Sequence, residues 1–329
     1  MATAAQVKAL IATHAKGDDV RFYAIAMQVA AHAARQGHTR FARELRDLVD
    51  EAQARVRATA PGQQTRPVPI VQPRGELVGL LAAGYPTTSL NEMALEPDVR
   101  ARLDRVLLEQ RQRERIREHG LHPIRKLLLV GPPGTGKTMT AAAMAGELRL
   151  PLFTIQLDGL ITRYLGETAA KLRLIFDAIQ QTRGVYLFDE FDALGGERGA
   201  RNEVGEIRRV LNSFLQFLEL DESDSLIVAA TNHPQILDRA LFRRFDAVIE
   251  YGHPSPEVVE RVLRARLALL GENDVDWVRL IEAGRGLSHA DLVRACDHAA
   301  KNAILDDRSG VETEEVLRSL SERRAASAE

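Results

Sequence analysis

The sequence of 329 residues lacks the features that would place it outside the cell or in a membrane. It has one cysteine, Cys296, so no disulfide can form within the chain and a reducing compartment is expected. No stretch approaches the roughly 18 consecutive apolar residues of a membrane-spanning helix. The first residues also lack an apolar run behind a basic start, so we expect no secretory signal. These absences predict a cytoplasmic protein.

An excess of charge of one sign is also missing. The formal net charge is −2, and 45% hydrophobic with 27% charged residues is the composition of a soluble globular protein. Because no overall positive field favours nucleic acid, we do not expect a nucleic-acid partner. The metalloprotease motif HExxH, a serine nucleophile elbow and a zinc-type Cys/His cluster are absent too, so the chain is not expected to carry its own peptidase.

Composition divides the chain into four parts. Residues 1–56 have apolar positions at helical spacing between capping and stop residues, which predicts a small bundle of three helices. Residues 57–89 are rich in proline and glycine and are interpreted as a linker. Residues 90–253 alternate strand and helix patterns, and residues 254–329 are again helical. The dense charges of residues 91–120 alternate in sign, which is typical of a solvated helix face.

Five short apolar runs in the third part predict buried strands: KLLLV (126–130), PLFTI (151–155), VYLFD (185–189), SLIVAA (225–230) and AVIEY (247–251). Helical segments separate them. Near-continuous apolar strands that alternate with helices indicate a parallel sheet covered on both faces. The predicted fold class is therefore α/β, with a five-stranded parallel sheet followed by helices.

The segment GPPGTGKT matches the phosphate-loop pattern G-x-x-x-x-G-K-[ST] between an apolar strand and a helix. Its glycines let the backbone curl so that N–H groups face phosphate oxygens, and the helix N-terminus adds a favourable dipole. We expect Lys137 to reach the β- and γ-phosphates and the Thr138 hydroxyl to ligate Mg²⁺. The predicted nucleotide contacts in this segment are Gly131, Pro132, Pro133, Gly134, Thr135, Gly136, Lys137 and Thr138.

An acidic element, VYLFDEFDAL, follows about fifty residues later. Asp189 stands at the end of an apolar strand, where open α/β sheets bind their ligands, and is expected to hold Mg²⁺ together with Thr138. Glu190 is expected to orient and deprotonate the attacking water. Asp192 is interpreted as a solvated or helix-capping residue. The predicted cofactors are ATP and Mg²⁺.

The segments GPPGTGKT, FDEFDAL and AATNHPQILDRALFRRFD together resemble the AAA family of the AAA+ ATPases, across residues 90 to 320. The resemblance implies a P-loop core followed by a small helical lid. It implies that Asn232 contacts the attacking water or the γ-phosphate. It also implies that Arg243 and Arg244 are arginine fingers that reach the site of a neighbouring subunit. The partner expected first is therefore the chain itself, in a ring that the family makes a hexamer.

The segment ITRYLGETAAKLRLIF resembles the family's central-pore segment. The resemblance implies that Tyr164, Leu165 and Gly166 line a channel and grip a protein substrate. The alternative is a core tyrosine at the start of a helix. Residues 195–205 are either a second pore loop or only an exposed loop.

The chain departs from the family at two places near the nucleotide. The lid sequence GLSHADL has His289 where the family usually has glycine, whereas Ala290 and Asp291 match. His289 and Ala290 are predicted near the nucleotide; His289 either contacts it or caps a helix. The family's segment before the phosphate loop is not evident near residues 85–100, so contacts to the base there cannot be assigned. Cys296 falls on an apolar helix face and is interpreted as a core residue.

The leading functional hypothesis is a hexameric ATPase that remodels, unfolds or threads a protein substrate. The whole chain, including RFYAIAMQ and AARQGH near its start, is similar to bacterial AAA ATPases encoded beside a subtilisin-like serine protease. Those pairs act in plasmid incompatibility and antiviral defence, which implies a separate subtilisin-like protease as partner. Two alternatives stay open: a DNA-acting ATPase such as a loader or transposition helper, and an ATP-dependent assembly switch without translocation.

Overall fold

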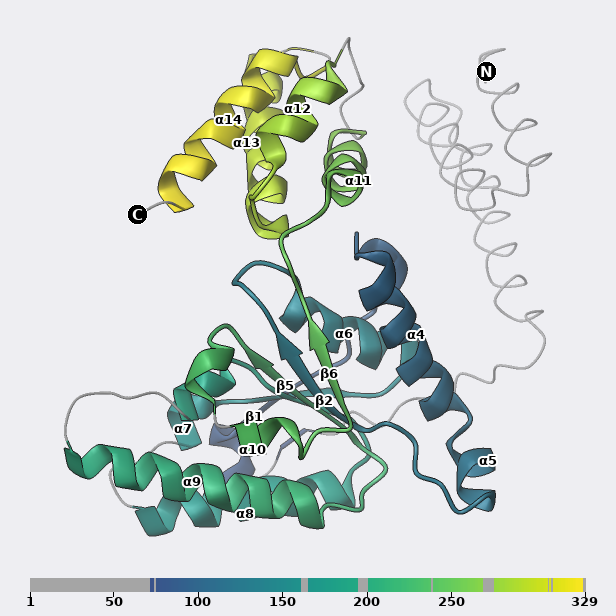
Figure 1. Cartoon of the computed structure of the whole chain (residues 1–329), viewed down its shortest axis with the longest axis vertical. Coiled ribbons are helices and arrows are strands. Elements are labelled where there is room, and N and C mark those ends of the chain that lie inside the picture. The colour runs from purple at the N-terminus through teal and green to yellow at the C-terminus, as the bar shows by residue number, and fades with distance from the viewer. Residues whose placement is uncertain are drawn as a thin grey trace, which may run out of the picture. The chain divides into compact units, whose positions relative to one another are not determined.

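A computed structural model (Figure 1) describes residues 72–73, 75–160, 165–194, 201–237, 239–268, 275–306, 308 and 310–327. All of them belong to one compact unit, Val71–Glu329. The predicted bundle of residues 1–56 lies outside the described residues, as does most of the predicted linker before Gly75.

The core of the unit is a six-stranded mixed sheet with the strand order β1-β3-β4-β5-β2-β6. The strands are β1 (Leu81–Gly84), β2 (Lys126–Val130), β3 (Leu152–Ile155), β4 (Val185–Phe188), β5 (Leu226–Thr231) and β6 (Ala247–Glu250). Strands β2 to β6 correspond to the five predicted apolar runs and pair in parallel. The expectation of a purely parallel five-stranded sheet is nevertheless wrong, because β1 adds an antiparallel edge to β3.

Strand β1 lies within residues 57–89, the range interpreted as a linker. It is four residues long and pairs on one side only, with Leu81 opposite Ile155. Leu81 is buried whereas Ala82 and Ala83 are exposed, so the strand offers one large apolar residue to the core. Such a short edge strand has almost no periodic signal for sequence reasoning to detect.

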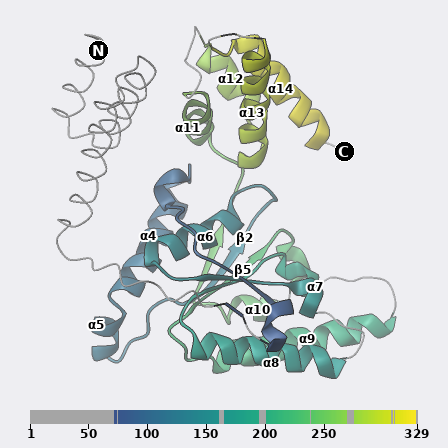
Figure 2. The same cartoon turned by 180° about the vertical axis from the view of Figure 1, so that it is seen from behind.

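Both faces of the sheet are covered, which explains the apolar runs. Every residue of β2, β4 and β5 is buried. Along β2, Leu128 belongs to the core on the side of α8 and α9, whereas Leu127 and Leu129 pack with α4 and α6 on the other side. Figures 1 and 2 show these two helix pairs on opposite sides of the sheet. A strand buried on both faces needs apolar residues at successive positions.

The helical segments begin at recognisable signals. Helix α4 starts with Pro97, and its charged face pairs Arg100 with Asp104 and Arg105 with Glu109 at i,i+4 spacing, as predicted for a solvated face. The helical elements around the sheet are η1 (Gly75–Gly79), η2 (Leu90–Glu92), α4 (Pro97–Arg111), α5 (Arg113–Glu118), α6 (Lys137–Leu148), α7 (Leu157–Leu160), α8 (Leu165–Gln181), η3 (Phe191–Leu194), α9 (Arg201–Leu220), η4 (Pro234–Ile236) and α10 (Arg239–Phe242).

After β6 the chain forms a helical subdomain with its own apolar core. Its helices are α11 (Pro256–Leu267), α12 (Trp277–Gly284), α13 (His289–Leu305) and α14 (Thr313–Ser327). Ser255 caps α11 by accepting a hydrogen bond from the Val258 N–H, and Ser288 caps α13 in the same way from Asp291. Cys296 is buried in this core, and burial raises the pKa of its thiol to about 12, which agrees with the predicted core role. None of the described helices is long and apolar enough to cross a membrane.

Candidate nucleotide site

The predicted phosphate loop joins the end of β2 to the start of α6. Gly131 has a φ of 153° and Gly134 a φ of 74°. A Cβ on Gly131 would lie 2.3 Å from the Tyr251 carbonyl oxygen, and one on Gly134 would lie 2.6 Å from Ser288 Oγ. Both positions therefore require glycine, since any side chain would be strained and would collide. Along the loop, exposed residues are Pro133, Gly134 and Thr138, half-buried ones are Gly131, Pro132 and Gly136, and buried ones are Thr135 and Lys137.

Lys137 is a buried cation inside this loop. Its Nζ donates to the carbonyl oxygens of Gly131 and Pro132, both at 2.7 Å, and the Thr135 hydroxyl donates to the same Pro132 carbonyl at 2.8 Å. Burial lowers the pKa of Lys137, an effect that the nearby Asp189 and Asp192 charges oppose. Within the described part of the chain Lys137 forms no ion pair. A buried ammonium held only by carbonyl dipoles suits an anionic ligand such as a phosphate.

Thr138 and Asp189 meet where β2 and β4 end. The Thr138 hydroxyl donates to Asp189 Oδ2 at 2.6 Å. We call this side of the sheet, where β2, β4 and β5 end, the carboxyl edge. A hydroxyl and a carboxylate oxygen at one point are hard ligands of the kind that Mg²⁺ prefers alongside phosphate oxygens. The two predicted metal ligands thus fit the group that the motif implies.

Glu190 follows directly and is exposed, with a left-handed backbone conformation at φ 50°. Its N–H donates to Asp189 Oδ1 at 3.0 Å. A residue with a side chain pays an energetic cost in a left-handed conformation and keeps it only where surrounding contacts hold it. Such residues cluster at functional sites. Glu190 thus lies at the carboxyl edge with an exposed side chain.

Asp192 has a role that the sequence analysis missed. Its Oδ1 accepts hydrogen bonds from the Thr231 hydroxyl (2.9 Å) and the Asn232 N–H (3.2 Å). The Asp192 carboxylate therefore links the acidic turn after β4 (Asp189–Asp192) to the end of β5, and it positions half-buried Asn232. This differs from the predicted solvated or capping side chain. Only its spacing of two residues from Glu190 hints at this role in the sequence.

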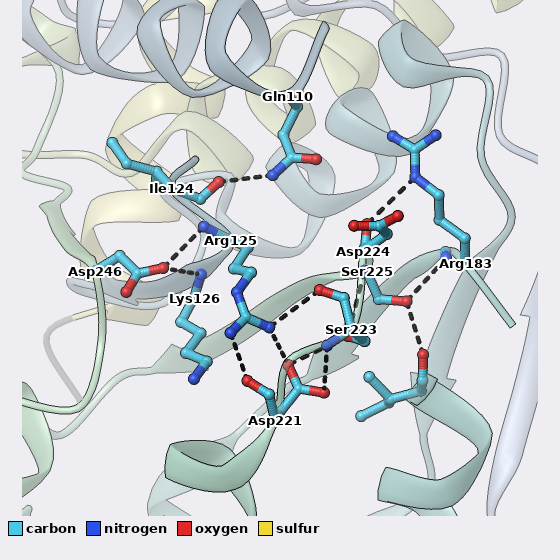
Figure 3. Close-up of polar contacts among 12 residues, drawn as sticks. Gln110, Ile124, Arg125, Lys126, Arg183, Asp221, Ser223, Asp224, Ser225 and Asp246 are labelled. Atoms are coloured by element: carbon cyan, nitrogen blue, oxygen red, sulfur yellow. Dashed lines mark hydrogen bonds and ion pairs between the residues drawn. The ribbon is translucent and has the colours of Figure 1, made fainter. Parts of the chain in front are cut away.

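Arg243 and Arg244 lie at the opposite side of the sheet, the amino edge, where β2, β4 and β5 begin. The next strand, β6, starts with Ala247 beside Leu127, near the beginning of β2. Asp246 Oδ2 accepts from the backbone N–H groups of Arg125 and Lys126, both at 2.9 Å. Figure 3 shows this anchor beside the pair formed by Arg125 and Asp221. The length of β2, about 3.3 Å per residue over five residues, separates both arginines from the phosphate loop of the same chain.

The two exposed arginines differ in their contacts. Arg244 forms an ion pair with Glu219 at the end of α9. Arg243 has no hydrogen bond or ion pair with any described residue. The predicted phosphate loop, Glu190 and Asn232 lie together at the carboxyl edge. The structure does not bring Arg243 or Arg244 to them.

The helical subdomain after β6 (α11–α14) corresponds to the predicted lid. It contacts the phosphate loop through the start of α13. The Ala290 N–H donates to the Gly134 carbonyl at 3.0 Å. His289 Nε2 lies 2.9 Å from the Ala94 carbonyl, and burial lowers the pKa of its imidazole. Because Ser288 is the N-cap of α13, the capping alternative for His289 is wrong. His289 instead joins the lid to the segment before α4.

That segment is the part of the site that could not be assigned from the sequence. A Cβ on Gly136 would lie 3.3 Å from Met93 Cε, so Met93 touches the phosphate loop. The segment is shaped by a capping box in which Ser89 and Glu92 bond each other's backbone N–H groups. A Ser-x-x-Glu pattern shortly before Pro97 was the available signal, although it indicates a helix start and not a ligand site.

The pore prediction lies largely outside the described residues. Tyr164 is not among them, and Leu165 and Gly166 are described only as the backbone start of α8. Of residues 195–205, only the backbone from Arg201 onward is described, as the beginning of α9.

Comparison with known proteins places this geometry in context. Residues 127–253 match the model of the ATPase family associated with various cellular activities (AAA). The chain is 34% identical over 332 residues to an uncharacterized AAA family ATPase of Sinorhizobium fredii, covering 100% of this chain and 98% of that protein. It is also 34% identical to the proteasome-activating nucleotidase of Methanothermobacter thermautotrophicus, over 71% of this chain and 60% of the relative. A further relative is the ATP-dependent zinc metalloprotease FtsH 1 of Methylacidiphilum infernorum, 39% identical over 59% of this chain. The matched region spans 32% of that longer protein.

Proposed function

The chain belongs to the AAA family of ATPases, and from this we propose that it hydrolyses ATP at the carboxyl edge of its sheet, with arginines supplied by a second copy. The observation that carries the proposal is the 2.6 Å contact of the Thr138 hydroxyl with Asp189. It joins the phosphate loop to the acidic turn at the one edge where strand ends, loop amides and helix α6 converge.

Each side chain at this edge has a distinct task. Lys137 would hold phosphate oxygens in place of the two carbonyls that it contacts now, and Thr138 with Asp189 would hold Mg²⁺. Mg²⁺ supplies positive charge against the phosphates when it is bound. Glu190 takes the proton of the attacking water, and Asn232, positioned by Asp192, orients that water.

The placement of Arg243 and Arg244 supports self-association. In one chain they lie at the amino edge, away from the loop that they would serve. A second copy that offers its amino edge to the carboxyl edge of the first would complete the site. Charge stabilisation by such an arginine contributes about 10³ to 10⁵ in rate. This head-to-tail contact closes into a ring when the rotation permits, and the family resemblance favours six copies.

The test of ATP hydrolysis is the Glu190→Gln variant. We expect it to bind ATP with unchanged affinity and to release phosphate at least a hundredfold more slowly, since only the base is removed. A radiolabelled or fluorescent nucleotide measures binding, and phosphate release measures turnover. Wild-type turnover in this variant would remove Glu190 from the proposal.

We propose protein as the substrate class, gripped in a channel by Tyr164, Leu165 and Gly166. The support is the sequence resemblance of this segment together with relatives named for proteolysis and proteasome activation. Tyr164→Ala should keep basal ATP hydrolysis and lose remodelling of an unfolded reporter protein. Stimulation of hydrolysis by DNA, with a steep salt dependence, would instead identify a DNA-acting ATPase.

A subtilisin-like serine protease is the proposed partner, and it rests on the resemblance of the whole chain alone. The ATP-bound Glu190→Gln variant is the appropriate bait, because trapped ATP should hold any nucleotide-dependent complex together. Recovery of a serine protease with this variant, and not with a Lys137→Met variant, is the expected result. Equal recovery with both would argue against ATP-controlled pairing.

A further inference from the structure

A buried tyrosine, Tyr251, lies where the chain leaves the sheet and enters the lid. Tyr251 directly follows β6 and precedes the short connection to α11. Its N–H donates to the Val130 carbonyl at 2.7 Å, and its own carbonyl is the atom that a Cβ on Gly131 would strike. The backbone of Tyr251 is therefore in close contact with the start of the phosphate loop, and the chain after Tyr251 continues into the lid.

The Tyr251 side chain reaches the other end of the same loop. Its hydroxyl lies 2.7 Å from the hydroxyl of Thr140, and both residues are buried. The Thr140 hydroxyl in turn donates to the Gly136 carbonyl at 3.0 Å. Because Thr140 has a single hydroxyl proton and gives it to Gly136, Tyr251 must be the donor to Thr140. The result is a one-way chain of hydrogen bonds from Tyr251 through Thr140 to Gly136.

The end of this chain adds a second hydrogen bond to the Gly136 carbonyl, which also accepts the Thr140 N–H at 2.9 Å. The Gly136 carbonyl belongs to the same planar peptide as the Lys137 N–H, so holding one atom fixes the other. The Lys137 N–H belongs to the first turn of α6, where a helix offers N–H groups without intrahelical partners and a phosphate loop binds its anion. Successive hydrogen bonds also polarise one another inside a protein. The Tyr251 hydroxyl therefore reaches the loop through Thr140 and not directly.

We propose that Tyr251 is a positioning residue that couples the lid connection to the phosphate loop through Thr140. The inference rests on the proposed ATP site and adds to it a mechanical link. Displacement of the connection after β6 shifts Tyr251, and the shift is transmitted to the Gly136–Lys137 peptide. Both ends of the loop respond together, since the Tyr251 backbone touches Gly131 while its side chain reaches the Gly136 carbonyl through Thr140.

The test removes single hydroxyl groups. Tyr251→Phe and Thr140→Val should each raise the KM for ATP about fivefold, the effect of one hydrogen bond. Thr140→Ser keeps the hydroxyl and should retain the wild-type KM. The double variant should be no worse than either single one, because both changes break the same chain.

Tyr186→Phe is the matched control. The Tyr186 hydroxyl is also buried and donates to the carbonyls of Ala178 and Thr182, but it serves the structure beside β4 and not the loop. It should lower the melting temperature about as much as Tyr251→Phe and leave the KM for ATP unchanged. An unchanged KM in Tyr251→Phe, or equal KM shifts in both tyrosine variants, would overturn the proposal. Absence of ATP binding by the wild type would instead refute the proposed function itself.

Discussion

The two edges of the sheet treat charge in opposite ways. At the amino edge, two half-buried arginines have carboxylate partners: Arg125 with Asp221 at 2.6 Å, and Arg117 with Asp224 (Figure 3 shows the first pair). At the carboxyl edge, Lys137 is more deeply buried, and among the described residues its ammonium bonds only carbonyls of its own loop. An arginine with a carboxylate partner serves the fold, whereas a buried cation inside a glycine-rich phosphate loop, with no carboxylate partner among the described residues, indicates a place for an anionic ligand.

Arg243 differs from the paired arginines at the amino edge. It is exposed and has no partner among the residues that the structure describes. Its neighbour Arg244 is paired with Glu219. A site shared between two copies requires an unpaired cation of this kind at the amino edge. Its counter-charge would then belong to the neighbouring chain.

The largest expected effect comes from substituting Lys137, the first residue of α6, and comparing it with Lys126, the first residue of β2. Lys126 and Lys137 are both buried, and burial lowers the pKa of each. Lys137→Met should abolish detectable ATP binding, because the phosphates lose their only buried cation in the loop. Lys126→Met, the matched control, should bind ATP as the wild type does. Titration with a fluorescent ATP analogue distinguishes them, and equal loss in both variants would contradict the contrast between the edges.

The next effect concerns stability at the amino edge. The Asp221 side chain is fully buried and Arg125 is 14% exposed, so Asp221→Ala leaves a guanidinium without its counter-charge. We expect a loss of about 3–5 kcal/mol in the free energy of unfolding. Denaturant titration measures it, and ATP turnover per folded molecule at low temperature should not change. A large loss of turnover with little loss of stability would show that this edge is not mainly structural.

A smaller effect is expected from Asp192→Ala, which releases the end of β5. The Asn232 N–H and the Thr231 hydroxyl both lose their acceptor. We expect kcat to fall about tenfold, the effect of one to two hydrogen bonds, with little change in the KM for ATP. Thr231→Val removes one of the two bonds and should have a weaker effect. A change in KM alone would assign Asp192 to nucleotide binding and not to the positioning of Asn232.

The smallest effect is a pH dependence of stability from His289. Burial lowers its pKa below the ordinary 6.5, so the unfolded chain takes up a proton before the folded one does. The contribution of neutral His289 is thus complete above pH 6.5 and is lost as the pH falls through the folded-state pKa. Glu96, His253 and Arg261 also act on this imidazole. Melting temperatures of wild type and His289→Gln between pH 5 and 8 should converge at the acidic end; parallel curves would contradict this assignment.

Sequence reasoning found the buried framework because burial on both faces leaves a strong pattern. β2, β4 and β5 are buried throughout, so their apolar runs were visible. Strand β1 was missed because one buried leucine at a sheet edge creates no period. The phosphate loop and acidic turn were visible because their chemistry fixes residue types at short spacing.

What could not be predicted depends on contacts between distant residues. The Tyr251 and Thr140 hydroxyls are 111 positions apart, and Asp192 and Asn232 are 40 apart. Each pair is recognisable only after the sheet has placed its strand ends side by side. The same holds for Met93, whose contact with the loop depends on how the segment before α4 folds back.

The claim that each ATP site combines two opposite edges is tested most directly by mixing two inactive variants. One carries Glu190→Gln with intact arginines, and the other carries Arg243→Ala and Arg244→Ala with an intact carboxyl edge. Alone, each should hydrolyse ATP at least a hundredfold more slowly than the wild type. When the two variants are mixed and allowed to exchange subunits, they should regain a substantial part of the wild-type ATP hydrolysis. Some sites then combine an intact carboxyl edge from one chain with intact arginines from the other. Activity in the mixture that equals the average of the separate variants would contradict the account.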